Sequence, residues 1–96
     1  MAELLDDHTV GDRLSGLDGW RREGDAIAVD REFADFAAAM RYVGLVADAA
    51  EAADHHPDIL IHSWNKVRLT VTNHSAGGLT QADFDLAATV DALPGG

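Results

Sequence analysis

The alternation of apolar and polar residues predicts four strands in the chain. A period of two runs from Ile27 to Phe33 and again from Val67 to Asn73. Alternate side chains of a strand point to opposite faces, so this period is typical of half-buried strands. Two further strands are predicted around Trp20 and from Ile59 to Trp64. The expected hairpin turns are Glu23-Gly24-Asp25 and Asn65-Lys66.

Apolar residues at three- and four-residue spacing predict a long central helix from Phe36 to about Asp54. Asp35 is a suitable N-cap, and the helix should finish near His55 because Pro57 cannot continue it. The apolar stripe is predicted at Phe36, Ala37, Met40, Val43, Ala47 and Ala50. Covering both the sheet and a partner would need more apolar surface on this helix than the periodicity shows.

Two shorter helices are predicted near the ends of the chain. The first covers residues 3–14, where leucines and Val10 lie among acids, and it ends near Gly16. The second follows Thr80-Gln81-Ala82-Asp83, which has the pattern of a capping box, and runs to about Leu93 before Pro94-Gly95-Gly96. Its inward positions should be Phe84, Leu86, Ala87 and Val90.

The order of these elements predicts an α+β fold. Strands in hairpin pairs, with helices between and after them, favour a two-layer sandwich in which the helices cover one face of a four-stranded antiparallel sheet. The element order is (α)ββαββα. The 96 residues suffice for one hydrophobic core, so residues 1–96 are expected to form a single domain.

Composition narrows the classes of partner. Seven basic and 17 acidic residues give a net charge of −10, which disfavours direct binding to nucleic acid or anionic membranes. The acidity fits either adaptation to high salt or an ordinary acidic surface. No apolar run is long enough for a membrane span, and Met1-Ala2-Glu3 lacks the features of a secretory signal. The absence of cysteine excludes disulfides and is consistent with a cytoplasmic location.

Three histidines are the strongest candidates for chemistry. His55 and His56 end the long helix before Pro57, and His74 ends a predicted strand. Imidazole titrates near neutrality, so it can both donate and accept protons. A metal site is disfavoured because neighbouring helical residues point about 100° apart. Capping of the helix C-terminus would explain one histidine but not three. His8 and His62 are given no role.

These residues carry a family resemblance. The segments Glu51-x-x-x-His55-His56-Pro57, Trp64-Asn65-Lys66-Val67, Thr72-Asn73-His74 and Gly78-Leu79-Thr80-x-x-Asp83 resemble pterin-4a-carbinolamine dehydratases. The similarity runs from Gly19-Trp20 to the last helix. It implies dehydration of 4a-hydroxytetrahydrobiopterin to quinonoid dihydrobiopterin, which recycles the cofactor of aromatic amino acid hydroxylases.

The resemblance also implies a site. The catalytic histidines would be His55, His56 and His74, with His55 and His74 transferring protons and His56 placing the substrate. The implied substrate contacts are His55, His56, Pro57, Asn73, His74, Ser75 and Ala76. Neither a metal nor an organic cofactor is expected, and the pterin substrate and a homodimer or homotetramer are the expected partners.

Several assignments stay open at this level. Glu51 either orients His55 or faces solvent, and Asp83 is favoured as a helix cap that can also face the site. Trp20 and Trp64 are expected to pack in the core more readily than to form a wall for the pterin. Ile59 stands where some family members carry an aromatic residue. The alternative function is a non-catalytic assembly or coactivator-type interaction protein on the same fold.

Overall fold

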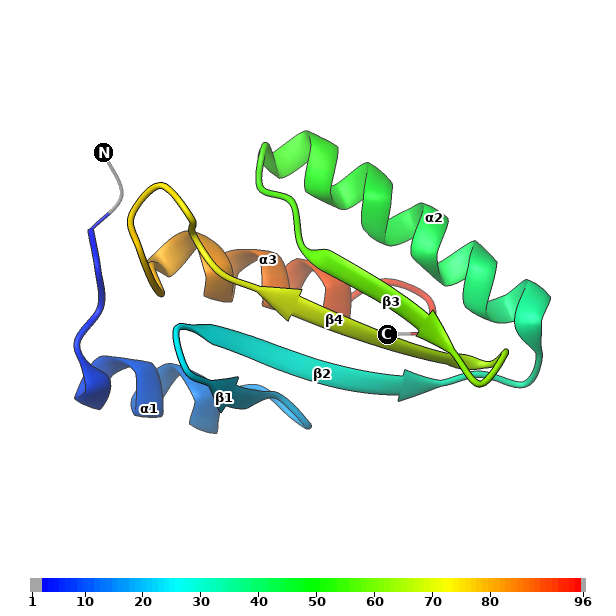
Figure 1. Cartoon of the computed structure of the whole chain (residues 1–96), viewed down its shortest axis with the longest axis horizontal. Coiled ribbons are helices and arrows are strands. Elements are labelled where there is room, and N and C mark those ends of the chain that lie inside the picture. Colours follow the sequence, from blue (N-terminus) through cyan, green and yellow to red (C-terminus); the bar gives the residue numbers. More distant parts are fainter. Residues whose placement is uncertain (1–2, 96) are drawn as a thin grey trace.

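A computed structural model describes residues 3–95, and Met1, Ala2 and Gly96 lie outside this range. Figure 1 shows three helices and four strands in the predicted order. The helices are α1 (Asp7–Ser15), α2 (Phe36–Ala53) and α3 (Gln81–Asp91). The strands are β1 (Arg21–Glu23), β2 (Ala26–Glu32), β3 (Asp58–His62) and β4 (Lys66–Val71). No helix within the described range is long and apolar enough to cross a membrane.

The four strands form one antiparallel sheet in the order β1-β2-β4-β3. In Figure 1, α3 lies behind the sheet, α2 above it and α1 below it, and no helix crosses the front of the sheet, so this face is open. The α+β two-layer architecture predicted from the sequence is therefore confirmed. The two central strands pair in a register that places Val29 opposite Leu69, which aligns their buried side chains.

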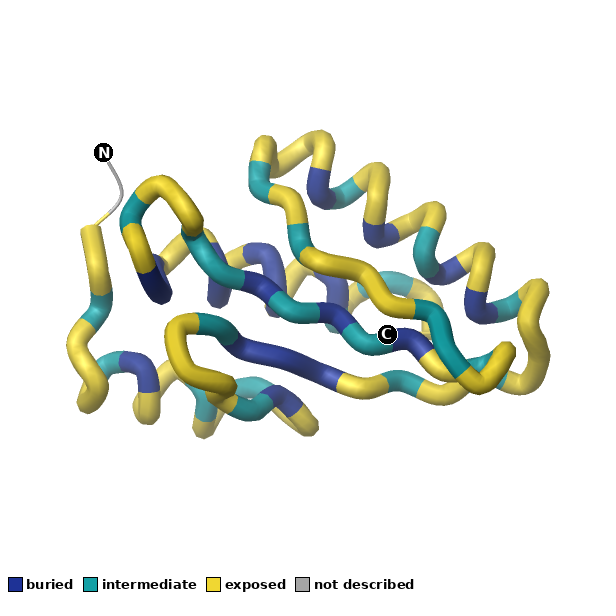
Figure 2. Tube along the Cα trace, in the orientation of Figure 1, coloured by how far each residue is buried: buried dark blue, intermediate teal, exposed yellow. Residues whose placement is uncertain are grey.

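The hydrophobic core lies between the sheet and the helices. Val67, Leu69 and Val71 are each at most 1% exposed, and the residues between them are less buried, as the period of two predicts. This alternation is visible along β4 in Figure 2. The four inward positions predicted for the last helix are all buried in α3, and they are Phe84, Leu86, Ala87 and Val90.

The predicted helix and turn signals in the first half of the chain are confirmed. The Asp35 carboxylate accepts a hydrogen bond from the Ala38 N–H at 2.8 Å, which caps α2. The helix ends at Ala53, where Asp54 adopts a left-handed conformation with φ of 50°. Gly24 begins the two-residue turn between β1 and β2 with φ of 61°, a conformation that favours glycine.

Three boundaries differ from the prediction. Helix α1 starts at Asp7 instead of residue 3, because Asp6 caps it and the preceding segment pairs with the chain before α3 through Leu5 N–H and Leu79 C=O. The turn between β3 and β4 occupies residues 63–65, with Lys66 already in the strand. Strand β4 ends at Val71, two residues early, because Asn73 pairs with Gly78 within the following loop.

The apolar stripe predicted for the long helix is correct at Ala50, which is buried, and in part at Val43, which is partly buried against the core, and it is wrong at the other four positions. The residues that α2 buries against the rest of the molecule are Ala39, Tyr42, Val46 and Ala50. Tyr42 packs on Phe33 with ring centroids 4.9 Å apart, whereas Phe36 and Met40 are 52% and 44% exposed. The helix is apolar around most of its circumference, so periodicity could not identify the buried side.

The two tryptophans differ in their surroundings. Trp20 is 7% exposed and belongs to the core, and its Nε1–H donates to the Asp91 carboxylate at 3.1 Å. Trp64 is 59% exposed in the turn after β3, at the opposite end of that strand from His55-His56-Pro57. Core packing is thus confirmed for Trp20 and wrong for Trp64.

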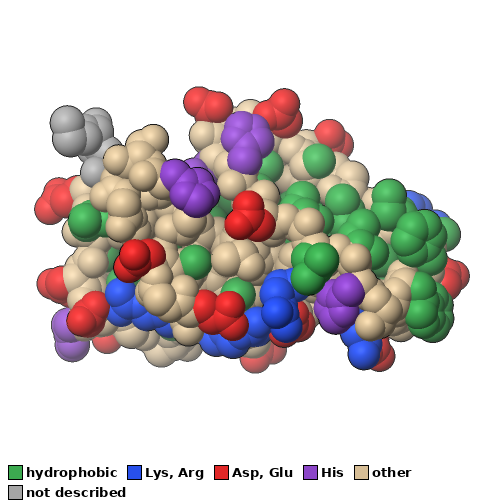
Figure 3. Space-filling view, in the orientation of Figure 1, with side chains coloured by type: hydrophobic (Ala, Val, Ile, Leu, Met, Phe, Trp, Pro, Cys, Tyr) green, Lys and Arg blue, Asp and Glu red, His purple; other side chains and the backbone are tan. Residues whose placement is uncertain are grey.

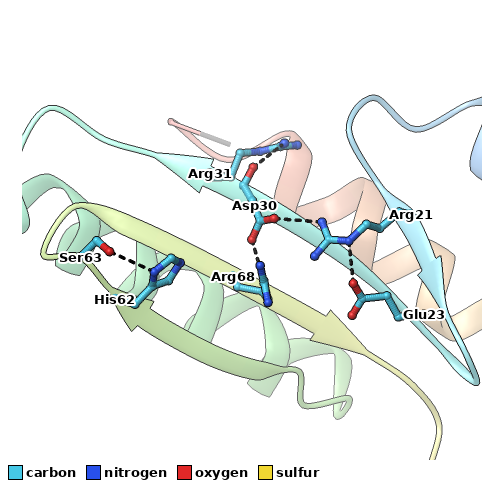
Figure 4. Close-up of polar contacts among 7 residues, drawn as sticks. All are labelled: Arg21, Glu23, Asp30, Arg31, His62, Ser63 and Arg68. Atoms are coloured by element: carbon cyan, nitrogen blue, oxygen red, sulfur yellow. Dashed lines mark hydrogen bonds and ion pairs between the residues drawn. The ribbon is translucent and has the colours of Figure 1, made fainter.

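The open face of the sheet carries a cluster of paired charges (Figure 4). The Asp30 carboxylate accepts hydrogen bonds from Arg68 Nε at 2.8 Å and from Arg21 Nη1 at 3.0 Å. Arg21 also donates to Glu23 at 2.7 Å. The hydrogen bond from Arg68 lowers the pKa of Asp30 below its usual value. These pairs join β1, β2 and β4 across their exposed side.

Replacing Asp30 with Asn should lower the free energy of unfolding at pH 7 by less than about 1 kcal/mol, because exposed ion pairs contribute little. A lowered carboxyl pKa stabilises the fold above the pKa of the unfolded chain, and that contribution disappears as pH falls through the folded value. The difference between wild type and Asp30→Asn should therefore shrink from pH 5 to pH 3 in urea denaturation. A double-mutant cycle with Arg68→Gln isolates the pair, and a coupling energy that is unchanged at pH 3 would contradict this account.

Candidate active site

The ends of three neighbouring strands gather the candidate residues at one end of the sheet. Asp58 at the start of β3 pairs with Thr70 near the end of β4, and Ile27 near the start of β2 pairs with Val71. Since the strands are antiparallel, the segment 55–57, the loop 73–78 and the turn 24–25 all leave the sheet at this end. The loop then leads into α3, whose first turn carries Asp83.

His55 and Asp83 make the most specific contact at this end. His55 Nε2 lies 2.5 Å from Asp83 Oδ1, and the Asp83 side chain is fully buried while that of His55 is 14% exposed. An ionised carboxylate only accepts hydrogen bonds, so Nε2 carries the hydrogen. Neutral His55 then has its lone pair on Nδ1, and the buried carboxylate stabilises the imidazolium that forms when Nδ1 takes a proton.

Asp83 combines this contact with a helix cap. Its second oxygen, Oδ2, accepts a hydrogen bond from the Thr80 backbone N–H at 2.7 Å, which completes the predicted capping box. The two oxygens therefore have different partners, one in the backbone of α3 and one in the imidazole. The capping role is confirmed, and the contact with His55 shows that the cap does not exclude the site.

Glu51 contacts His56 instead of His55. Glu51 Oε2 lies 2.6 Å from His56 Nε2, and the two side chains are 75% and 59% exposed. The left-handed Asp54 turns the chain at the end of α2, so that His56 folds back beside the last helical turn. This exposed pair can hold the orientation of the His56 ring, which fits a placing role better than proton transfer.

The loop with His74 is built around Asn73. The Asn73 side chain accepts a hydrogen bond from the Ala76 N–H at 3.0 Å. The backbone carbonyl of Asn73 accepts hydrogen bonds from the N–H groups of Gly77 and Gly78. His74 and Ser75 are exposed within this turn. A recess of about 280 Å³ lies here and is lined by Asp25, Ala26, Thr72, Asn73, His74, Gly77 and Gly78. Figure 3 shows two histidine patches close together on this side of the molecule.

Two features of this end were not predicted from the sequence. Asp25 lines the recess with His74, although the sequence indicated only a turn residue at that position. The second feature is which carboxylate each histidine contacts, Asp83 for His55 and Glu51 for His56, and this depends on the left-handed turn at the end of α2. Within residues 3–95, no group of three or more histidine and carboxylate side chains has an arrangement suited to a metal ion.

The other recess with a histidine lies on the open face of the sheet. It measures about 280 Å³ and is lined by Asp30, Arg31, Glu32, His62, Lys66 and Arg68. In this recess Asp30 and Arg68 form an ion pair with each other, and Lys66 Nζ lies 3.9 Å from Glu32 Oε1. Within residues 3–95, the one hydrogen bond of the His62 side chain joins its Nδ1 to Ser63 Oγ at 3.3 Å. This recess therefore lacks the carboxylate–imidazole pairing found at the ends of the strands.

Comparison with known proteins gives a consistent result. The sequence profile of the family described as pterin 4 alpha carbinolamine dehydratase matches residues 3–93. A relative from Trichormus variabilis is 48% identical over 93 residues, covering 97% of this chain and 99% of the relative. One from Acidobacterium capsulatum is 50% identical over the same length and coverage. Both are named, provisionally, pterin-4-alpha-carbinolamine dehydratase.

Solved structures share the fold. A transcriptional coactivator/pterin dehydratase from Brucella melitensis superposes with a TM-score of 0.88 at 32% identity, covering 94% of this chain and 97% of the other. A pterin dehydratase-like protein identified as a RuBisCO assembly factor of the alpha-carboxysome has a TM-score of 0.65 at 25% identity, with coverage of 77% and 87%. The chain belongs to the pterin 4 alpha carbinolamine dehydratase family.

Proposed function

We propose that this protein dehydrates 4a-hydroxytetrahydrobiopterin to quinonoid dihydrobiopterin. In this reaction the bond between C4a and the hydroxyl oxygen breaks and a double bond forms between C4a and the neighbouring ring nitrogen. One group protonates the departing hydroxyl, which leaves as water, and another removes the proton from the nitrogen. The step needs no oxidant and no reductant, and two imidazoles can perform both transfers near neutral pH.

The contact between His55 and the buried Asp83 carries the proposal. A carboxylate on one ring nitrogen prepares the other to accept a proton, so we assign His55 as the base. We assign His74, exposed in the neighbouring loop, as the acid for the hydroxyl, and His56 as the residue that places the substrate. The segment 73–76, in which His74 and Ser75 are exposed, and the half-buried Pro57 complete the proposed contacts with the pterin.

A direct assay tests the function. The protein should accelerate water loss from synthetic 4a-hydroxytetrahydropterin, followed by ultraviolet absorbance, above the rate in buffer. His74→Ala should lower kcat by about 10²-fold or more if this imidazole is the acid. Thermal unfolding of the variant should match that of the wild type, because His74 is exposed. Full kcat in His74→Ala would contradict its role, and a wild-type rate equal to that in buffer would overturn the enzyme assignment.

The second candidate is a non-catalytic interaction protein on the same fold. One structural neighbour is identified as a RuBisCO assembly factor, and another carries the double description of coactivator and dehydratase. An exposed apolar side of α2 is the feature of this chain that such a role would use. The assay above separates the two, since an interaction protein would bind its partner without accelerating the dehydration.

We also propose that the chain forms a homodimer or homotetramer through α2. One exposed side of α2 carries Phe36 and Met40, at 52% and 44% exposure, and Leu45, at 37% exposure, lies on the opposite flank of the helix. Hydrophobic side chains gather over this part of the molecule in Figure 3. Several exposed apolar residues along one helix are typical of a protein interface.

The pattern of charges on α2 suits a second copy of the same helix. Arg41 and Asp48 are both exposed and lie on the same flank of this side. Antiparallel helices related by a two-fold axis between residues 44 and 45 would place Arg41 of one copy near Asp48 of the other. Gly44 at the centre would allow close approach. The same surface of α2 on two copies can therefore be complementary in charge.

Met40→Lys should convert the assembly to a smaller species, because it places two unpaired charges in the interface. Sedimentation velocity at matched concentrations would measure the change. Leu4→Lys is the control, since Leu4 is 53% exposed but lies before α1, where it pairs with Thr80 at the start of α3. Equal masses for wild type and Met40→Lys would contradict an interface at α2.

Three further proposals rest on the sequence and not on the site geometry. We propose that residues 1–96 form one domain, that the reaction needs no metal or organic cofactor, and that the protein works in the cytoplasm. The lack of cysteine supports the last of these. Activity that survives dialysis against a chelator would support the second, and activity that requires an added metal would refute it.

A further inference from the structure

We propose that Asp25 recognises the 2-amino edge of the pterin substrate, an inference that rests on the proposed dehydratase function. Asp25 is an exposed residue in the turn between β1 and β2. It lines the same recess of about 280 Å³ as His74. The proposed roles of the three histidines concern the reacting end of the substrate, and they leave the opposite end of the ring system without a recognition group.

The position of Asp25 follows from the sheet. Ile27 of β2 pairs with Val71 at the end of β4, so the turn that precedes β2 lies beside the residues that follow β4. The backbone carbonyl of Asp25 accepts a hydrogen bond from Thr72 Oγ1 at 2.5 Å. This bond holds the turn against the end of β4, directly before the loop with His74. The carboxylate reaches over that loop, because Asp25 Oδ1 lies 4.0 Å from the place where a Cβ on Gly78 would be. Leu4 Cδ2 lies 3.2 Å from the same place, so Leu4 and the Asp25 carboxylate both pack close to Gly78, which has no side chain.

The chemistry of the pterin matches a carboxylate at this place. The 2-amino group and the neighbouring N3–H are two parallel donors with the spacing of a guanidinium fork, which carboxylates bind with both oxygens. The 2-amino carbon lies directly across the pyrimidine ring from C4a. A pterin that binds Asp25 by this edge therefore directs C4a away from Asp25, toward the side of the recess where His74 lies.

A comparison of two ligands tests this recognition. Wild type should bind 7,8-dihydrobiopterin about 10- to 100-fold more tightly than the lumazine analogue with oxygen in place of the 2-amino group, as expected for hydrogen bonds to a charged acceptor. Asp25→Asn should lose most of this preference, because its amide can donate to the 2-oxo group. It should also raise KM for the carbinolamine. Titration calorimetry and steady-state kinetics provide these measurements.

The controls separate recognition from folding. Asp18→Asn changes another exposed acid outside the recess and should keep the preference for the amino ligand. Asp25→Ser keeps a residue suited to turns and should lose the preference as Asp25→Asn does, with both variants matched to wild type by thermal unfolding. An unchanged preference in either folded variant would overturn the role of Asp25 while leaving the dehydratase assignment intact. Failure of wild type to bind either ligand or to accelerate the reaction would overturn the proposed function and this inference together.

Discussion

His55→Gln should lower kcat for dehydration by about 10²–10⁴-fold, the range that general acid–base catalysis contributes. The glutamine amide can still donate a hydrogen bond to Asp83, but it cannot take up a proton near neutral pH. The loss should therefore fall mainly on kcat, with a smaller change in KM. Stopped-flow absorbance of the carbinolamine would measure both constants.

His62→Gln is the matched control for this experiment. His62 lies at the end of β3, away from the gathered strand ends, and among the described residues its side chain hydrogen-bonds with Ser63 and with no carboxylate. We expect this variant to keep the wild-type kcat. An equal loss in both variants would indicate a general effect on the protein, and a full rate in His55→Gln would remove His55 from proton transfer.

Replacement of Asp83 should separate its two roles. Asp83→Ala removes the acceptor of the Thr80 N–H and the partner of His55 from a fully buried position. Loss of a cap costs about 1 kcal/mol, and a buried donor without a partner costs about 1–3 kcal/mol more. We expect a decrease of about 2–4 kcal/mol in the free energy of unfolding, measured in urea, together with a large loss of activity.

Asp83→Asn is the more informative variant. Its amide oxygen can still accept from the Thr80 N–H, so most of the stability should remain. The amide cannot stabilise a charged His55 as a carboxylate does, so kcat should fall about 10-fold or more. If Asp83→Asn kept full activity, the buried carboxylate would be a helix cap alone. If it unfolded as readily as Asp83→Ala, the contact with Thr80 would depend on the charge.

Much of the fold could be predicted because local patterns were unambiguous. The alternation in β4 and the inward residues of α3 correspond to the observed burial, and the caps Asp35 and Thr80 begin their helices where expected. Each of these signals involves residues within a few positions of one another. Local geometry alone then assigns each side chain to a face or a cap.

The burial of α2 could not be predicted in the same way. Alanine and glycine occupy several of its positions, so more than one side of the helix is apolar. The packing of Tyr42 against Phe33 selects the buried side, and these residues come from different elements. The surface left outside, with Met40, is the one that we propose for assembly.

At the candidate site, the sequence indicated the three histidines and the resemblance indicated their chemistry. It did not indicate that Glu51 contacts His56, that Asp83 contacts His55 while capping α3, or that Asp25 shares the recess of His74. These relations join residues from different elements of the fold. They depend on strand register, on the left-handed turn at Asp54 and on the place where α3 begins, because spacing along a chain does not specify distances between elements that pack together in space.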